Sequence, residues 1–147
     1  MAEKINVKKL NANAKLPTYG SEFSAGADLY ACLDEAVTIM PGEAVLIHTG
    51  LAMEIPVGFA GLIYARSGLA TKKGLAPSNK VGVIDADYRG EIMVSLFNHS
   101  KEERVIENGE RIAQLVVTPF LSCDFEEADE LLETKRGEGG FGSTGTK

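Results

Sequence analysis

Short apolar stretches alternate with turn residues along most of this chain. Glycine or proline recurs roughly every ten positions. Between these turn residues lie stretches rich in β-branched and aliphatic residues: Ala44–His48, Gly61–Tyr64, Glu91–Phe97 and Ile112–Phe120. In the third stretch, Ile92, Val94 and Leu96 occupy every second position, so an extended backbone would turn all three toward a core. Short strands at this spacing predict an all-β sandwich or barrel.

One short helix is expected over Ser67–Gly74. Ser67 is a suitable N-cap, Lys72 and Lys73 would place positive charge in the last turn, and Gly74 would end the helix. The acidic stretch Asp124–Leu131 allows either a helical turn or an edge segment, and its charges favour a solvated face.

Length and charge limit the classes of partner. A chain of 147 residues and 15.7 kDa suits one domain. Fifteen Lys and Arg against 21 Asp and Glu give a net charge of −6, which argues against a nucleic-acid partner. A small anionic ligand would need a local basic pocket or a metal cation. No apolar run approaches the roughly 20 residues of a membrane span, so no membrane partner is expected.

The cysteines and the N-terminus favour a cytoplasmic location. The first residues lack the apolar segment of a secretory signal. Cys32 and Cys123 lie far apart, without neighbours typical of a zinc site, and we expect two free thiols in a reducing compartment.

The last dozen residues differ in composition from the rest. The stretch 136–145 holds five of the 16 glycines and one aromatic residue, so it should be flexible by itself. A plain disordered tail is one interpretation. However, Arg136, Phe141 and the pair Ser143 and Thr144 are spaced by glycines, which let backbone N–H groups approach a phosphate. We therefore expect a β domain over 1–135 and a C-terminal arm over 136–147 that folds over a ligand.

Two internal stretches carry candidate chemistry. Arg66 and Ser67 stand at the expected start of the helix, where N–H groups and a guanidinium favour an anion, although a capped surface helix explains them equally well. The stretch 79–91 reads as a hairpin. On an extended backbone Asp85 and Asp87 would share one face, with Tyr88 on the other, and one carboxylate could activate a water. An Asp-rich turn with a packed tyrosine is the alternative.

Polar residues also enter the last apolar stretch. Arg111 could neutralise an interior or interface carboxylate, and Gln114 could reach a phosphate oxygen or a water, although polar residues at the start of a strand need no such role. His48 and His99 have no acid or nucleophile motif beside them, which favours structural roles.

Taken in order, these stretches resemble the trimeric all-β dUTP diphosphatase (dUTPase) family. Five motifs across nearly the whole chain carry the resemblance: Ala25–Ala31, Arg66–Ala70, Gly82–Glu91, Gly109–Leu115 and Arg136–Gly145. The resemblance implies a jelly-roll-like fold and a homotrimer with three active sites at subunit boundaries. It implies hydrolysis of dUTP to dUMP and pyrophosphate, with Mg²⁺ held mainly by the triphosphate. This reaction limits uracil in DNA and supplies dUMP for dTMP synthesis.

The resemblance also implies roles for individual residues. Asp85 would be the general base for attack on the α-phosphorus, and Asp28 would belong to the metal–water network or its support. Tyr88 would pack under the deoxyribose and exclude a 2′-hydroxyl. The uracil would be held by Asn79, by the backbone of Val83, Ile84 and Asp85, and by a pocket that Met93 lines. Phosphate oxygens would be held by Arg66, Ser67, Gly68 and Gln114. The arm would add Arg136, Ser143 and Thr144 at the γ-phosphate, with Phe141 stacked on the base and Gly142 beside it.

Two other functions remain open at this point. A dCTP deaminase shares this fold and assembly, but it needs a general acid or base at C4 of the base. The Asp85 hairpin and the complete arm fit water attack on phosphorus better. A non-catalytic trimeric β module that binds nucleotides or proteins is the second alternative, and Asp85 argues against it.

Overall fold

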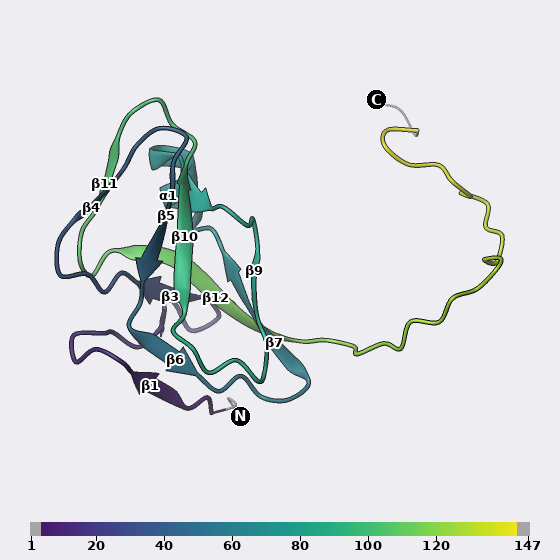
Figure 1. The fold of residues 1–147 in the computed structure, drawn as a ribbon, viewed down its shortest axis with the longest axis horizontal. Coiled ribbons are helices and arrows are strands. Elements are labelled where there is room, and N and C mark those ends of the chain that lie inside the picture. Colours follow the sequence, from purple (N-terminus) through teal and green to yellow (C-terminus); the bar gives the residue numbers. More distant parts are fainter. Residues whose placement is uncertain (1–3, 144–147) are drawn as a thin grey trace.

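The computed structural model describes residues 4–143, and strands dominate its body (Figure 1). The largest sheet has five antiparallel strands in the order β2 (Thr18–Tyr19), β3 (Ala27–Tyr30), β12 (Arg111–Pro119), β7 (Phe59–Tyr64) and β9 (Gly82–Ile84). A second sheet orders β5 (Ala44–His48), β10 (Met93–Asn98) and β8 (Leu75–Pro77). Two pairs complete the body: β1 (Val7–Lys9) with β6 (Leu51–Met53), and β4 (Val37–Ile39) with β11 (Arg104–Ile106). The expected all-β, jelly-roll-like fold is confirmed.

One hydrophobic core joins the two larger sheets. Leu29 on β3 and Leu115 on β12 belong to the same buried cluster as Ile47 on β5. The predicted alternation is confirmed: Ile92, just before β10, and Val94 and Leu96 within it are 2%, 2% and 0% exposed, whereas Met93, the first residue of β10, is 36% exposed. Burial of side chains this size contributes about 1.5–3 kcal/mol each. The core thus follows directly from the period-two pattern of the sequence.

The single helix of the described residues, α1 (Ser67–Lys73), lies within the expected range, but Ser67 is its first helical residue rather than its N-cap. Its N-cap is Arg66, which has extended backbone and makes no side-chain capping bond, and Ala70 N–H donates to the Arg66 carbonyl. The predicted capping role of Ser67 is therefore wrong, because Ser67 is already helical. Gly74 ends the helix as predicted, with a left-handed φ of 68°. At seven residues, the helix is too short to cross a membrane, and residues 4–143 contain no other candidate.

The chain leaves the body after β12. Phe120 N–H still donates to the Gly58 carbonyl, but the hydrogen bonds of residues 121–143 all stay within that segment. Figure 1 shows this exposed C-terminal segment (residues 121–143) running away from the sheets. It has no helix or strand, so Asp124–Leu131 is neither a helical turn nor a paired edge. The expected domain boundary at residue 135 thus lies inside the exposed segment rather than at its start.

Both cysteines are free thiols, as expected. Cys123 lies on the exposed C-terminal segment, whereas Cys32 is buried. Burial raises the pKa of the Cys32 thiol, and the nearby carboxylates of Glu91 and Asp34 raise it further. Cys32 is therefore a protonated core thiol at neutral pH.

One buried polar side chain ties β10 to two neighbouring segments. Asn98 is fully buried, and its Nδ2 donates to the carbonyls of Ile39 at 2.9 Å and Glu102 at 2.8 Å. Its Oδ1 accepts from the backbone N–H of Ser100 at 2.9 Å and from the Ser100 hydroxyl at 2.7 Å. All of its hydrogen-bonding capacity is used, so the network stabilises this end of the sheet.

We expect Asn98→Ala to lower the free energy of unfolding by about 3 kcal/mol, because it leaves buried carbonyl and N–H groups without partners. Denaturant titration at one fixed protein concentration measures this loss. Lys101→Ala, on the exposed turn that follows, is the control and should stay within about 0.5 kcal/mol of the parent. Equal stability of the two variants would contradict the structural role of Asn98.

Candidate active site

A pocket of about 410 Å³ opens beside the start of α1. Three strands bring its residues together: Asp28 on β3 lies opposite Gln114 on β12, and Gln114 lies opposite Tyr64 at the end of β7. The chain then passes directly from β7 through Arg66 into α1. The pocket is lined by Gly20, Ser24, Ala25, Gly26, Asp28, Arg66, Ser67, Gly68, Arg111 and Gln114. We call it the arginine pocket.

A carboxylate with two guanidinium partners organises the arginine pocket. Arg66 Nε donates to Asp28 Oδ1 at 2.7 Å, and Arg111 Nη1 donates to Asp28 Oδ2 at 3.3 Å. The Asp28 side chain is only 13% exposed, against 26% for Arg66 and 51% for Arg111. The expectation that Arg111 neutralises an interior carboxylate is confirmed. Because each oxygen of Asp28 already accepts a charged N–H, its immediate effect is to orient the two arginines.

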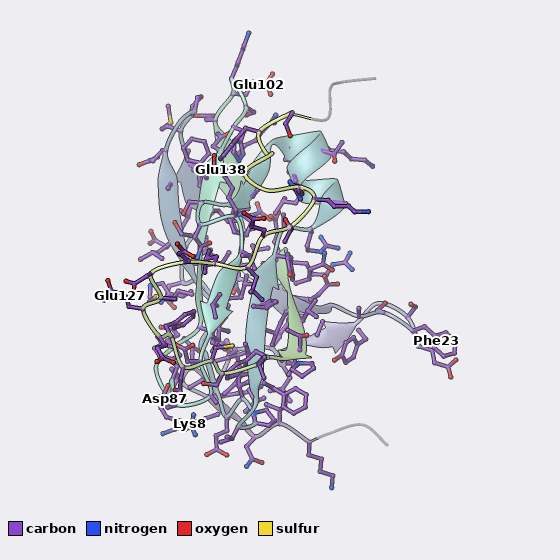
Figure 2. All side chains as sticks on the ribbon, turned by 90° about the vertical axis from the view of Figure 1, so that its right-hand side faces the viewer. Lys8, Phe23, Asp87, Glu102, Glu127 and Glu138 are labelled. Carbon is purple, nitrogen blue, oxygen red and sulfur yellow. The ribbon has the colours of Figure 1, made fainter. Side chains whose placement is uncertain are left out.

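Gln114 is fixed by a close approach to backbone. Its Nε2 donates to the Ala65 carbonyl at 2.9 Å. A Cβ at Gly26 would lie 2.5 Å from Gln114 Oε1, so only glycine leaves room for the amide there. The loop that carries Gly26 also carries Phe23, which is 90% exposed and stands out from the body in Figure 2. Gly26 lies in the first motif of the resemblance but was given no role of its own, and Gly20 and Ser24 were given none either.

A second pocket, of about 240 Å³, lies at the connection between β9 and β10. These two strands belong to different sheets and do not pair, so the prediction of a paired hairpin over 79–91 is wrong, and we use the word hairpin only for this connection. It is lined by Leu46, Ile63, Asn79, Gly82, Val83, Ile84, Asp85, Tyr88, Glu91, Ile92 and Met93. The sequence expectations for Asn79, Val83, Ile84, Asp85, Tyr88 and Met93 thus fall on one pocket. We call it the hairpin pocket.

The tip of the hairpin is a turn rather than extended backbone. Tyr88 N–H donates to the Asp85 carbonyl at 3.2 Å, which closes a four-residue turn. Asp85 and Tyr88 therefore line the same pocket, and Asp87 does not line it. The prediction that Tyr88 points away from Asp85 is wrong, because a turn breaks the period of two. Tyr88 Oη donates to the Glu91 carbonyl at 2.8 Å, and Gly90 gives the ring room, since a Cβ there would lie 2.5 Å from Oη.

The remaining expected residues lie on the exposed C-terminal segment. Arg136 Nε donates to the Gly139 carbonyl at 2.7 Å, and Phe141 is fully exposed. Gly142 and Ser143 are exposed as well, and Thr144 lies outside the described residues. The expected site residues therefore form three groups: the arginine pocket, the hairpin pocket and the arm. No residue lines both pockets.

The carboxylates do not form a cage for a metal ion. Within residues 4–143, no three His, Cys, Asp or Glu side chains are grouped so as to hold one. The carboxylates that line the two pockets are Asp28, Asp85 and Glu91. A divalent cation would thus need most of its oxygen ligands from a bound phosphate ligand, which is a usual arrangement for Mg²⁺. These carboxylates fit Mg²⁺ only when a phosphate ligand supplies most of its oxygen ligands.

Glu91 lines the hairpin pocket without having been given a role from the sequence. Its partners, His48 and Gly50, are more than 40 positions away along the chain. No local motif signals such a contact.

Comparison with known proteins identifies the family of this chain. The family model for dUTPase matches residues 12–145. A deoxyuridine 5′-triphosphate nucleotidohydrolase from Hydrogenobaculum sp. (strain Y04AAS1) is 52% identical over 98% of this chain and 99% of its own length. One from Acinetobacter baylyi is 49% identical over 98% of this chain and 97% of its own length.

Solved structures with a similar fold are also dUTPases. The dUTPase of Staphylococcus bacteriophage 80alpha with dUpNHpp has a TM-score of 0.88 at 32% identity, covering 99% of this chain and 100% of that chain. A dUTPase from phage phi11 of S. aureus, solved for the coordination of a structural Mg(II) ion, has a TM-score of 0.78 at 27% identity, covering 87% of this chain and 98% of that one. From its sequence and its fold, the chain belongs to the dUTPase family.

Proposed function

We propose that this chain hydrolyses dUTP to dUMP and pyrophosphate, through Mg²⁺-assisted attack of water on the α-phosphorus. The observation that carries the proposal is the match, over nearly its full length, to deoxyuridine 5′-triphosphate nucleotidohydrolases. In the cell this reaction limits uracil in DNA and supplies dUMP for dTMP synthesis. The two free thiols suit a cytoplasmic location, since reducing compartments keep cysteines free.

The arginine pocket is suited to the triphosphate. Arg66 offers a guanidinium already oriented by Asp28, and the backbone of Ser67 and Gly68 lies beside it. Gln114 keeps one amide hydrogen for a phosphate oxygen while the other bonds to Ala65. An acidic chain thus presents its cations where charge develops during phosphoryl transfer.

The hairpin pocket is suited to deoxyuridine. The backbone of Val83, Ile84 and Asp85 and the amide of Asn79 can bond the uracil edge, and close contact of the base with this turn would leave no room for a 5-methyl group. Tyr88 presents a ring whose hydroxyl is already used by Glu91. A 2′-hydroxyl against that ring would lose water without gaining a partner, which favours the deoxyribose. Met93 lines the same wall.

Asp85 is the general base of the proposed reaction. Its carboxylate lines the hairpin pocket, is solvent-exposed, and forms no ion pair with the rest of residues 4–143. An ionised carboxylate with free lone pairs can accept a proton from a water held for in-line attack.

Mg²⁺ would be held mainly by triphosphate oxygens, with Asp28 acting at a distance through water or through the arginines it orients. When bound, the ion would neutralise charge on the phosphates as the bond to the leaving group breaks. The structural Mg(II) ion of the phage phi11 relative supports metal use in the family.

A homotrimer with shared active sites accounts for the separation of the three groups. In one subunit the two pockets share no residue, and the described part of the arm (residues 136–143) makes no hydrogen bond to the body. Phe125, Leu131 and Leu132 on the exposed C-terminal segment are 98%, 88% and 96% exposed, which is costly for a segment without a partner. A neighbouring subunit offers a surface for it and brings a second set of pockets within reach.

Substrate preference tests the function. We expect pyrophosphate release with Mg²⁺ to favour dUTP over dTTP, dCTP and UTP by at least about 10²-fold in kcat/KM, because each competitor adds or changes a group that the hairpin pocket contacts. A chelator should abolish most turnover. Deamination of dCTP would instead indicate a dCTP deaminase, and nucleotide binding without turnover would indicate a non-catalytic module.

Replacing the proposed base separates binding from chemistry. Asp85→Asn should lower kcat by about 10²–10⁴-fold and change dUTP affinity little, because the amide keeps the shape of the carboxylate but cannot take the proton. Asp87→Asn, on the same turn but outside the pocket, is the matched control and should keep normal turnover. Normal turnover of Asp85→Asn would refute the assignment of the base.

Deleting the arm from Arg136 onward should lower kcat by roughly 10²-fold, because water exclusion and γ-phosphate contacts are lost. The melting temperature and the sedimentation behaviour should stay those of the full chain, since residues 121–143 contribute nothing to the core. Full activity in a well-folded truncated protein would exclude a closing arm.

A further inference from the structure

Glu91 connects the hairpin pocket to a part of the chain that does not touch substrate. Its Oε1 accepts from the backbone N–H of Gly50 at 2.9 Å, and its Oε2 lies 2.9 Å from His48 Nδ1. The side chain of Glu91 is 24% exposed and that of His48 is 55% exposed. The Glu91 carbonyl accepts from Tyr88 Oη at 2.8 Å. Glu91 therefore bonds the Tyr88 hydroxyl through its carbonyl, and the end of β5 and the turn after it through its side chain.

The neighbouring residue strengthens the same connection. Ile92 N–H donates to the Leu51 carbonyl at 2.8 Å, and the Thr49 hydroxyl donates to the Ile92 carbonyl at 2.5 Å. Thr49 is fully buried and Ile92 is 2% exposed. The end of the hairpin is thus fixed to the core at residues 48–51.

The tip of the hairpin has no such connection of its own. Within the described chain, residues 85–90 form hydrogen bonds only with one another and with Glu91. On one side the tip continues from β9, which pairs with β7. On the other side its nearest hydrogen bonds to the body are those of Glu91 and Ile92, although Arg89 also lies beside residues of β1 and β6. The position of Asp85 and Tyr88 therefore depends on what holds Glu91.

We propose that Glu91 is a positioning residue for the active site, and that His48 and Gly50 are the partners through which it acts. The proposal rests on the proposed roles of Asp85 and Tyr88. In the proposed reaction Glu91 contacts neither the reacting atoms nor the metal ion. It holds residues 88–91 close to the core, and the hairpin pocket keeps its shape because of that.

The partner turn is built to keep its donor in place. Gly50 has φ of +67°, and a Cβ there would lie 2.9 Å from Ala14 Cβ and 3.1 Å from Cys32 Sγ. The backbone at residue 50 thus has one close-packed conformation, which aims its N–H at Glu91. A charge-assisted bond to a fixed donor places the carboxylate more sharply than two mobile side chains would.

The test compares Glu91→Ala with Glu91→Gln. The alanine variant loses both contacts and should lower kcat for dUTP by roughly 10- to 100-fold at a temperature well below unfolding, since small displacements of a catalytic group cost that much. Hydrogen–deuterium exchange at residues 85–90 should accelerate in the same variant. The glutamine variant keeps an acceptor for Gly50 N–H and a group facing His48, and should restore kcat to within about threefold of the parent.

Glu43→Ala is the matched control. Its carboxylate also accepts a backbone N–H, from Met40 at 3.0 Å, but in the turn between β4 and β5. This variant should keep both kcat and exchange at residues 85–90 at the values of the parent. A lowered melting temperature of Glu91→Ala with unchanged kcat and exchange would show a purely structural role and overturn the proposal.

If Glu91→Ala does not fold, His48→Ala still tests the proposal, because it leaves the hydrogen bond from Gly50 N–H to Glu91 intact. It should lower kcat by about threefold and accelerate exchange at residues 85–90 to a smaller extent. Unchanged kcat and exchange in this variant would overturn the role of His48. In a folded Glu91→Ala background, removing His48 should have no further effect, because the two side chains act as one unit.

Asp85→Asn in the same series separates this proposal from the proposed function. If Asp85→Asn turns over dUTP normally, the assignment of the base fails, whatever the Glu91 variants do. If Asp85→Asn is inactive and Glu91→Ala is fully active with slow exchange, only the positioning role fails.

Discussion

Strand β12 is the constraint on which the candidate site depends. It pairs with β3 on one side and β7 on the other, so it fixes where each of these strands ends. This pairing brings together Asp28, Gln114 and the segment that leads from β7 into Arg66. The pairing of β12 with β3 shifts register between Arg111 and Ala113 of β12, and Arg111, at the start of β12, bonds the carboxylate of Asp28. Residues distant in sequence thus form one pocket through strand pairing.

The pairing of Asp28 with two arginines also explains how an acidic protein can hold a triphosphate. A net charge of −6 opposes anions on average, but the first few ångströms decide binding, and salt screens the rest within about 8–10 Å. Asp28 removes part of the positive charge of Arg66 and Arg111, yet it fixes their direction. Orientation is the larger benefit, because guanidiniums in place before the substrate arrives need no reorganisation during the reaction.

The sequence predicted what depends on local periodicity and missed what depends on a single turn or a distant contact. The strand at Ala44–His48 and the buried face of β10 follow from alternation. The direction of Tyr88 did not follow, because one turn at residues 85–88 reverses it. Glu91 stayed without a role because Gly50 and His48 are brought to it only by the complete fold. Resemblance to a family named the site residues, but it could not say what holds them.

In the proposed trimer, closure of the exposed C-terminal segment would distinguish a triphosphate from a diphosphate or a monophosphate. Ordering a glycine-rich arm costs about 1–2 kcal/mol per residue, and nothing in the body of one subunit offsets this cost. In the proposed trimer, contacts of Arg136 and Ser143 with a γ-phosphate would offset it, whereas a diphosphate or the product dUMP would leave the arm open. Closure would then coincide with the ligand whose leaving group is pyrophosphate. A site completed only by its substrate excludes water during attack and releases its product afterwards, because the contacts that closed it leave with the pyrophosphate.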